Sequence, residues 1–224
     1  MSQSADSKSS LGAIVLSGGL SQRMGYPKWK LPLNGRTMLD HIVQSISSHV
    51  SHVVVASGSE TVEINWNNVD VVCDQNQNCG PLEGIRVGLE MLADRTEFAF
   101  VTACDTPFYI PAVVDFLFAK IDQYEAVIPT SPSHVYGMTG VYRNSSHEKI
   151  DRLIQQRKLR VSELATALDT LLVPTSEIRQ FDPELRCIYN INRPTDYFEL
   201  LELHGQECTE EVRLKLLSSG SGKE

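Results

Sequence analysis

The sequence predicts an α/β fold in which helices cover both faces of a mostly parallel central sheet. Short apolar runs compatible with buried strands recur along the first half of the chain, and segments with a helical apolar stripe lie between most of them. The chain has 224 residues with 42% hydrophobic content, and no stretch resembles a long interdomain linker. We therefore expect one domain with a substantial core.

Five apolar runs are expected to form the strands of this sheet. They span Ala13–Ser17, His52–Ala56, Val69–Cys73, Phe98–Ala103 and Ala126–Pro129. Cys73 and Cys104 belong to these runs or follow them directly, so we interpret both as core-facing thiols rather than nucleophiles.

Helical patterns follow most of the strands. Thr37 is suited to cap a helix whose apolar side chains share one face, namely Met38, Leu39, Ile42, Val43 and Ile46. Further helices are expected over Glu83–Ala93, Pro111–Ile121, Glu148–Arg157 and Ser162–Leu171, and from Thr195 onward, with a hairpin or bent strand around Val135–Arg143.

Composition excludes several classes of function. A formal net charge of -8 argues against general binding to nucleic acid or to an anionic membrane. The five cysteines show no CxxC pairing, and no apolar run approaches the length of a membrane helix, so we expect a reduced cytoplasmic protein. The polar ends predict a disordered tail over residues 1–10, a single domain over 11–206, and a C-terminal helix with a disordered tail over 207–224.

The stretch LSGGLSQRMGYPK, from Leu16 to Lys28, indicates a loop that binds phosphate. Gly18 and Gly19 let the backbone turn sharply beside an anion, and Arg23 and Lys28 add positive charge. The stretch is neither a P-loop, which needs a GK[ST] ending, nor a dinucleotide fingerprint, which opens directly into a helix. Because the whole chain is acidic, this local positive charge must hold the phosphate.

Polar side chains follow other strands at the edge where open α/β sheets bind ligands. Asp74 and Asp105 each come directly after an apolar run, and a carboxylate facing a phosphate loop calls for a cation such as Mg²⁺ between them. The phosphate loop favours a metal role for Asp105 over simple loop capping, whereas for Asp74 both interpretations stay open. Asn190 and Asn192 follow a strand-like Cys187–Tyr189 run, and could complete such a site or cap a turn.

The segment GPLEGIRVGLE after Asp74 begins with a Gly80-Pro81 turn. Gly84 and Gly88 lie four residues apart, so they share one face of the following helix. Small residues there admit either a base or ribose, or close packing of the helix on the sheet. The spacing alone favours packing.

Four motifs, in this order, closely resemble those of the molybdenum cofactor guanylyltransferases, the molybdopterin-guanine dinucleotide synthesis protein A family. They are LSGGLSQRMGYPKWKLPLNG, Asp74 with GPLEGIRVGL, VTACDTPFYIP and YNINRPTDYFEL, and the likeness runs from about Gly12 to about Leu203. The first and third are shared with a wider superfamily of nucleotidyltransferases, while GPLEG looks like the GPLAG or TPLAG of guanylyl-transferring members. The resemblance implies a three-layer Rossmann-like fold of the nucleotide-diphospho-sugar transferase type.

The resemblance also implies an activity and its partners. The expected reaction transfers GMP from GTP to the terminal phosphate of molybdopterin, or molybdenum cofactor, with Mg²⁺ and loss of pyrophosphate. A cofactor-delivery protein is a further partner that it allows, whereas no nucleic acid or membrane is expected. A related enzyme that uses CTP or a sugar phosphate acceptor, and a non-catalytic nucleotide-binding module, are the alternatives.

Residue roles are carried over from the family motifs in four sets. Arg23, Lys28 and Asp105 are the expected catalytic groups, and Asp105 and Asn192 the expected magnesium ligands. The acceptor is expected at Arg160, Asn190 and Asn192. The nucleotide is expected at Leu16, Ser17, Gly18, Gly19, Lys28, Asp74, Gly80, Pro81, Leu82 and Asp105.

The chain departs from the family pattern in four places. Ser17 replaces a frequent alanine, and Pro27 stands where many members have aspartate, a change shared with cytidylyl and sugar-nucleotide relatives. His134-Val135 replaces a frequent His-Pro on the acceptor side. Ala56 occupies the place of an asparagine that contacts guanine, so we expect other groups, such as Ser57 or backbone, to read the base.

Overall fold

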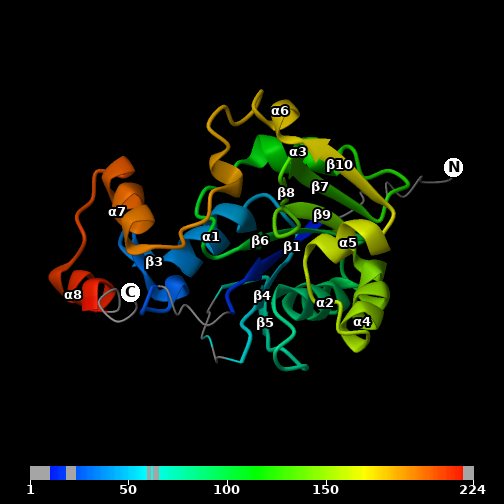
Figure 1. Cartoon of the computed structure of the whole chain (residues 1–224), viewed down its shortest axis with the longest axis horizontal. Helices are drawn as coiled ribbons and strands as arrows, with labels where there is room; N and C mark the ends of the chain where they lie inside the picture. Colours follow the sequence, from blue (N-terminus) through cyan, green and yellow to red (C-terminus); the bar gives the residue numbers. More distant parts are fainter. Residues whose placement is uncertain (1–10, 19–23, 60–61, 63–65, 219–224) are drawn as a thin grey trace, which may run out of the picture.

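The computed structural model describes residues 11–18, 24–59, 62 and 66–218. Its centre is an eight-stranded sheet with helices on both faces (Figure 1). The strands of this sheet are β1 (Leu11–Leu16), β4 (Val53–Ala56), β5 (Val69–Val72), β6 (Phe98–Ala103), β7 (Ala126–Ser131), β8 (His134–Val135), β9 (Gly140–Arg143) and β10 (Thr170–Pro174).

The sheet is mostly parallel. Its strands lie in the order β10-β7-β9-β6-β1-β4-β5, with β8 paired to β7. β9 runs antiparallel to both of its neighbours and β8 runs antiparallel to β7, while the other pairs are parallel. The chain leaves β1 for β4 on one side and later returns to β6 on the other. That reversal is where open α/β sheets bind ligands.

The helices and short 3₁₀ turns connect these strands. None of the helices within the described ranges is long and apolar enough to cross a membrane. The helices are α1 (Met38–Ser47), α2 (Pro81–Leu92), α3 (Pro111–Phe118), α4 (His147–Gln155), α5 (Ser162–Ala167), α6 (Thr175–Ile178), α7 (Pro194–Leu203) and α8 (Glu210–Ser218), and the 3₁₀ turns are η1 (Lys28–Lys30), η2 (Asn144–Ser146) and η3 (Arg186–Ile188).

Alternation along β1 builds the two faces of the core. Ala13 and Val15 pack with α1, whereas Ile14 and Leu16 pack with α2 on the opposite face. Because successive side chains of a strand point to opposite sides, a fully apolar strand is covered by helices on both faces. In Figure 1, α2 and α4 lie below the sheet while α3 and α6 lie above it.

The contact between α2 and β1 depends on two glycines. A Cβ atom at Gly88 would lie 2.8 Å from side-chain atoms of Ile14, and one at Gly84 would lie 2.9 Å from Leu16 Cδ2. Both distances are shorter than van der Waals contact. Close packing of the helix on the sheet is therefore the role of both glycines, as their spacing favoured.

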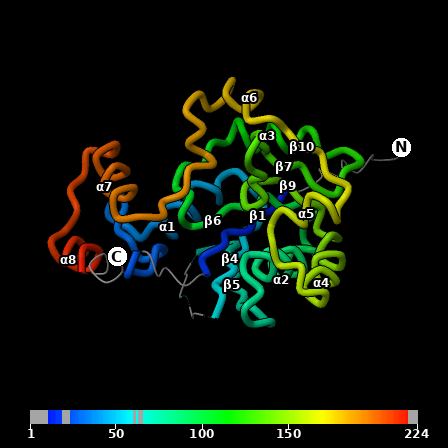
Figure 2. The backbone as a smooth tube through the Cα atoms, in the orientation of Figure 1, coloured from blue at the N-terminus to red at the C-terminus, as the bar shows by residue number. Residues whose placement is uncertain are grey.

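A separate apolar cluster joins residues 24–38 to the C-terminal helices. A small hairpin of β2 (Pro32–Leu33) and β3 (Arg36–Thr37) packs with α7 and α8, which lie together at one end of the molecule (Figure 2). The buried Tyr197 of α7 donates its hydroxyl hydrogen to the Pro32 carbonyl at 2.7 Å. The C-terminal helices thus hold the segment that follows the first loop.

Most expected elements are confirmed. All five strands are present within two residues of the expected bounds, and Thr37 caps α1 by accepting from the Asp40 N–H at 3.0 Å. The expected hairpin around Val135–Arg143 is formed by β8 and β9 with β7. The expected tails, residues 1–10 and 219–224, lie outside the described residues.

Three local expectations are wrong. The helix expected over Ser162–Leu171 ends at Ala167, and Thr170 begins β10, because that segment pairs in parallel with β7. The Cys187–Tyr189 run lies largely in η3 rather than in a strand, because the chain bends there before Asn190 meets Thr106. Cys73 is exposed rather than core-facing because it follows β5, the edge strand, whose residues are only half-buried.

We predict that Gly88→Ala destabilises the protein even though alanine favours a helix by about 1 kcal/mol over glycine. The new methyl group would overlap Ile14, so the free energy of unfolding in urea should fall by about 1–2 kcal/mol. Met91→Ala, on the exposed side of the same helix, is the control and should change it by no more than about 0.5 kcal/mol. A stabilised Gly88→Ala protein would contradict this account of the α2–β1 contact.

Candidate functional site

Three segments far apart in the sequence meet at one ammonium group. Lys28 Nζ donates to Asp105 Oδ2 at 2.8 Å and to Asn192 Oδ1 at 2.9 Å, across sequence separations of 77 and 164 residues. The side chains of Lys28 and Asp105 are only 16% and 17% exposed, so this ion pair is shielded from water on most sides. We refer to Lys28, Asp105 and Asn192 as the lysine cluster.

Backbone hydrogen bonds explain why these segments meet. The Cys104 N–H donates to the Leu16 carbonyl at 2.8 Å, which continues the β1–β6 ladder up to Asp105. The Ile191 N–H donates to the Asp105 carbonyl at 2.8 Å, and Thr106 Oγ1 donates to Asn190 Oδ1 at 2.7 Å. The segment that contains both asparagines is therefore held alongside the end of β6.

The N-terminus of α7 fixes the other end of that segment. Asp196 Oδ2 accepts from the backbone N–H groups of Asn192 and Arg193, both at 2.8 Å. A carboxylate at the third position of a helix commonly satisfies unpaired N–H groups at its start. Asn192 is thus held from its backbone while its side chain reaches Lys28.

The oxygen atoms of the lysine cluster fit a hard cation. Asp105 Oδ1 is buried and has no hydrogen-bond partner among the described residues, so it has an unused lone pair in a shielded place. Asn192 adds an amide oxygen. No group of three or more His, Cys, Asp or Glu side chains in the described ranges could hold a metal, so ligands besides the protein would be needed. Mg²⁺ is usually held this way, by one or two carboxylates with phosphate oxygens and waters.

The backbone at Gly18, where the glycine-rich first loop begins, passes close to the backbone at Gly58. A Cβ atom at Gly18 would lie 2.8 Å from Gly58 Cα, so only glycine allows the chain to pass there. The Ser17 N–H donates to the Ala56 carbonyl at 2.9 Å, and the Asp74 N–H donates to the Gly58 carbonyl at 2.8 Å. These hydrogen bonds join the carboxyl ends of β1, β4 and β5 at one edge of the sheet.

Asp74 and Asp105 lie at this edge but not at one point. The register aligns Leu16, Ala56 and Val72 with Ala103 across neighbouring strands, and β5 lies three strands away from β6. With strands about 4.8 Å apart, the two aspartates are separated by roughly 14 Å. They cannot share one metal ion, whereas a nucleotide lying along the edge could meet both.

Burial and neighbouring charges shift the pKa values of Asp74 and Cys104. Burial raises the pKa of Asp74, and the neighbouring Glu83 carboxylate raises it further while Arg86 opposes the change. Burial, with the Asp105 carboxylate, also raises the pKa of the Cys104 thiol. Cys104 is therefore held as a neutral thiol, in agreement with its expected role in the core.

The remaining expected site residues lie in different surroundings. Leu82 is fully buried in the core, so only its backbone could meet a ligand, while Gly80 adopts a φ of +61° just before Pro81 at the start of α2. Arg160 has an exposed side chain with no hydrogen bond or ion pair to another described residue. Two further expected site residues, Gly19 and Arg23, lie outside the described residues.

The Ser57 side chain lies inside the protein. The residue is fully buried, and its hydroxyl lies 3.4 Å from the Val72 carbonyl and 3.5 Å from Cys73 Sγ. The hydroxyl group is therefore not exposed at the edge of the sheet, and the expectation that Ser57 or backbone reads the base stays a prediction.

Sequence reasoning missed three residues that organise the site. Thr106 positions Asn190, and a buried Glu83–Arg86 ion pair lies beneath the loop that follows Asp74. The i,i+3 spacing of opposite charges on the expected helix was a signal for the ion pair. Thr106 gave no signal, since its partner lies 84 residues away.

Sequence comparison relates the chain to proteins of one family. Residues 13–170 match the model of the MobA-like NTP transferase domain. A protein from Methanosarcina mazei named "Probable molybdenum cofactor guanylyltransferase" is 33% identical, over 82% of this chain and 87% of that protein. The molybdenum cofactor guanylyltransferase of Desulfosudis oleivorans is 30% identical, over 80% of this chain and 88% of that protein.

Solved structures show the same fold. Molybdopterin-guanine dinucleotide biosynthesis protein A from Archaeoglobus fulgidus matches with a TM-score of 0.72 at 22% identity, covering 87% of this chain and 98% of that one. The 2-C-methyl-D-erythritol 4-phosphate cytidylyltransferase of Thermus thermophilus matches with a TM-score of 0.62 at 14% identity, covering 86% and 98%. The fold is thus the three-layer, Rossmann-like fold of nucleotidyltransferases.

We predict that Thr106→Val lowers the free energy of unfolding by about 1–2 kcal/mol, because it removes a hydrogen bond from a buried hydroxyl to Asn190. Urea denaturation followed by circular dichroism measures the change. Thr106→Ser keeps the hydroxyl group. Its free energy of unfolding should therefore fall by less than half as much as that of Thr106→Val. A Thr106→Val protein as stable as wild type would show that this hydrogen bond adds nothing to stability.

Proposed function

Since this chain belongs to the MobA-like NTP transferases, and among them to the molybdenum cofactor guanylyltransferases, we propose that it transfers GMP from GTP to the terminal phosphate of molybdopterin and releases pyrophosphate. The observation that supports this most is the lysine cluster. It brings a shielded ammonium group and two side-chain oxygen atoms to the end of β6, which lies beside the end of β1.

The proposed reaction needs no general base. A phosphate monoester has its second pKa near ~6, so the acceptor is already largely ionised at neutral pH. An oxygen of this phosphate attacks the α-phosphorus of GTP, and the bond from that phosphorus to the bridging oxygen breaks. The electron pair leaves with pyrophosphate. Catalysis then consists of holding two anions in line and neutralising the charge that develops.

We assign that neutralisation to Lys28. Its ammonium group is held between two oxygen atoms at the edge of the sheet, so little reorientation is needed to meet phosphate oxygens. Its ion pair with Asp105 is shielded from water on most sides. We assign to Arg23 a second positive charge on the triphosphate, as the motif implies.

We assign Mg²⁺ to the oxygen atoms of Asp105 and Asn192. The support is the buried, unpartnered Asp105 Oδ1 and the amide oxygen of Asn192, which both lie beside Lys28. Bound there, the ion would neutralise negative charge on the triphosphate. The nucleotide would extend from this point along the edge toward Asp74.

We place the acceptor on the β7–β9 half of the same edge. Asn190 lies beside Thr106, just after the end of β6, and β9 and β7 are the next strands on that side of the sheet. A Cβ atom at Gly137, in the turn before β9, would overlap Val161 Cγ1, so the exposed Arg160 belongs to a loop packed on this half of the sheet. A guanidinium there suits an anionic acceptor.

We predict that Asp105→Asn lowers turnover by about 10²–10⁴-fold, because it removes the charge that holds both Lys28 and the metal. Pyrophosphate release from GTP with molybdopterin measures turnover, and wild-type release should stop when EDTA removes Mg²⁺. Asp115→Asn is the matched control, since Asp115 lies on α3 with an exposed side chain that pairs with His49. Near wild-type activity in Asp105→Asn, with an unchanged circular dichroism spectrum, would remove the metal assignment.

The nucleotide and the acceptor are tested together by pyrophosphate release from GTP and from CTP, each with and without molybdopterin. We expect release from GTP to exceed that from CTP by at least ~10²-fold, and only with the acceptor present. A preference for CTP would favour a cytidylyltransferase. GTP binding without any pyrophosphate release would favour a non-catalytic nucleotide-binding module.

A further inference from the structure

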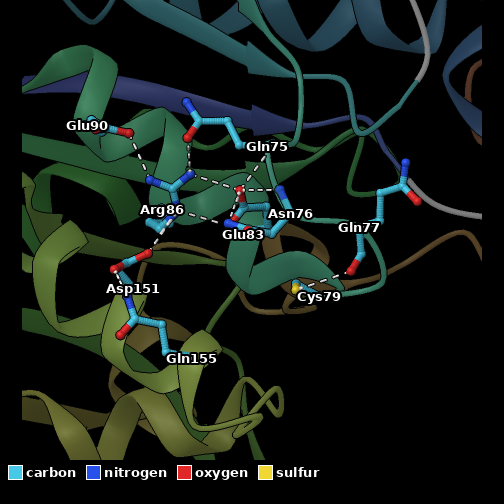
Figure 3. A network of polar contacts seen from close by, with 9 residues as sticks. All are labelled: Gln75, Asn76, Gln77, Cys79, Glu83, Arg86, Glu90, Asp151 and Gln155. Atoms are coloured by element: carbon cyan, nitrogen blue, oxygen red, sulfur yellow. Dashed lines mark hydrogen bonds and ion pairs between the residues drawn. The ribbon is translucent and has the colours of Figure 1, made fainter.

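The loop after Asp74 is tied to one carboxylate. Glu83 Oε1 accepts from the backbone N–H groups of Gln75 and Asn76, both at 3.0 Å, and from Asn76 Nδ2 at 3.1 Å. Glu83 itself is 0% exposed. Figure 3 shows its side chain at the centre of the polar contacts beneath this loop. Nothing in the proposed chemistry uses this carboxylate.

Arg86 completes the network from the same helix. Its Nε donates to Glu83 Oε2 and its Nη2 to Glu83 Oε1, both at 2.9 Å, in a two-pronged ion pair. It also donates to Gln75 Oε1 at 2.9 Å and to Glu90 Oε2 at 2.8 Å. Gln75 is therefore held twice, through its backbone by Glu83 and through its side chain by Arg86.

The position of Glu83 on α2 explains what it reaches. It is the third residue of the helix, where a carboxylate usually accepts from the backbone N–H at the helix cap. Here the carboxylate accepts from the loop instead. A buried carboxylate costs several kcal/mol to desolvate, and Arg86 with the loop N–H groups offset that cost. Hydrogen bonds from Arg86 and Asn76 outweigh burial and lower the pKa of Glu83, so it stays ionised.

The network fixes Asp74 from both sides. The Asp74 N–H donates to Gly58, and the next two N–H groups, those of Gln75 and Asn76, donate to Glu83. The Asp74 carboxylate lies over α2, because Oδ1 would be 4.0 Å from a Cβ atom at Gly84. Beyond Asn76 this support ends, and in Figure 3 the Gln77 side chain points away from Arg86.

We propose that Glu83 is a positioning residue for the nucleotide: it holds the loop that begins at Asp74 in the geometry that receives GTP. This inference rests on the proposed function, since it takes Asp74 to lie at the nucleotide. Glu83 acts through the loop and touches no substrate. Its loss should therefore weaken nucleotide binding more than it slows the chemical step.

The main test measures GTP binding by isothermal titration calorimetry, with KM and kcat from pyrophosphate release. In Glu83→Ala the loop loses three hydrogen bonds, so Kd and KM for GTP should rise about 10-fold or more while kcat changes less than about threefold. Glu83→Gln should recover part of the affinity, because its amide oxygen can still accept from the two backbone N–H groups.

Glu90→Gln is the matched control. It makes the same change of charge and removes another carboxylate partner of Arg86, but Glu90 is half exposed and has no contact with the loop. Its Kd for GTP should stay within about twofold of wild type. If Glu83→Ala binds GTP as tightly as wild type and only loses thermal stability, Glu83 is a structural residue and the proposal fails.

Amide hydrogen exchange in the nucleotide-free wild-type protein keeps the test independent of variant folding. By NMR, the Gln75 and Asn76 amides should exchange at least about 10-fold more slowly than those of Gln77 and Asn78. Equal rates would overturn the proposal. Absence of GTP binding by the wild-type protein would instead contradict the proposed function, and the exchange rates would still show whether Glu83 orders the loop.

Discussion

The site depends on the ion pair between Lys28 and Asp105. Burying a lysine or a carboxylate this far from water costs free energy unless the two are paired. Their pairing therefore requires that Lys28 and the end of β6 stay together. Asn192 extends this requirement to the C-terminal segment. The apolar side chains of α7, α8 and the β2–β3 hairpin pack around Ile191 and so hold that segment in place. The lysine cluster and this apolar cluster therefore stabilise the same arrangement of Lys28, the end of β6 and the C-terminal segment.

The two sides of helix α2 have different roles. Its glycines face β1 and let the helix backbone approach the sheet closely, while Glu83 and Arg86 of its first two turns organise the loop after Asp74. The close approach brings the N-terminus of the helix to the ligand edge of the sheet. Packing on one side of α2 thus sets the position of the polar network on the other.

Local patterns predicted the parallel core well because the central strands β1, β4 and β6 are almost entirely buried and α1 carries one apolar stripe. Thr37 even marked the first residue before α1 correctly. The errors lie where tertiary pairing overrides local preference. Residues 170 and 171 joined β10 because β7 offers an unpaired edge, and Cys187 entered a 3₁₀ turn because the chain must bend there to bring Asn190 to Thr106.

The sequence by itself predicted a phosphate-binding loop, from its glycines and its lysine, and a strand-end aspartate suited to a cation, while the reaction class came from the resemblance of four motifs to one family. It also identified the candidate residues at the ends of β1, β5 and β6. Only the tertiary structure decided which of them meet. Asp105 contacts Lys28 while Asp74 lies three strands away, and Glu83 holds the Asp74 loop, because strand order and long-range hydrogen bonds depend on how the whole chain packs.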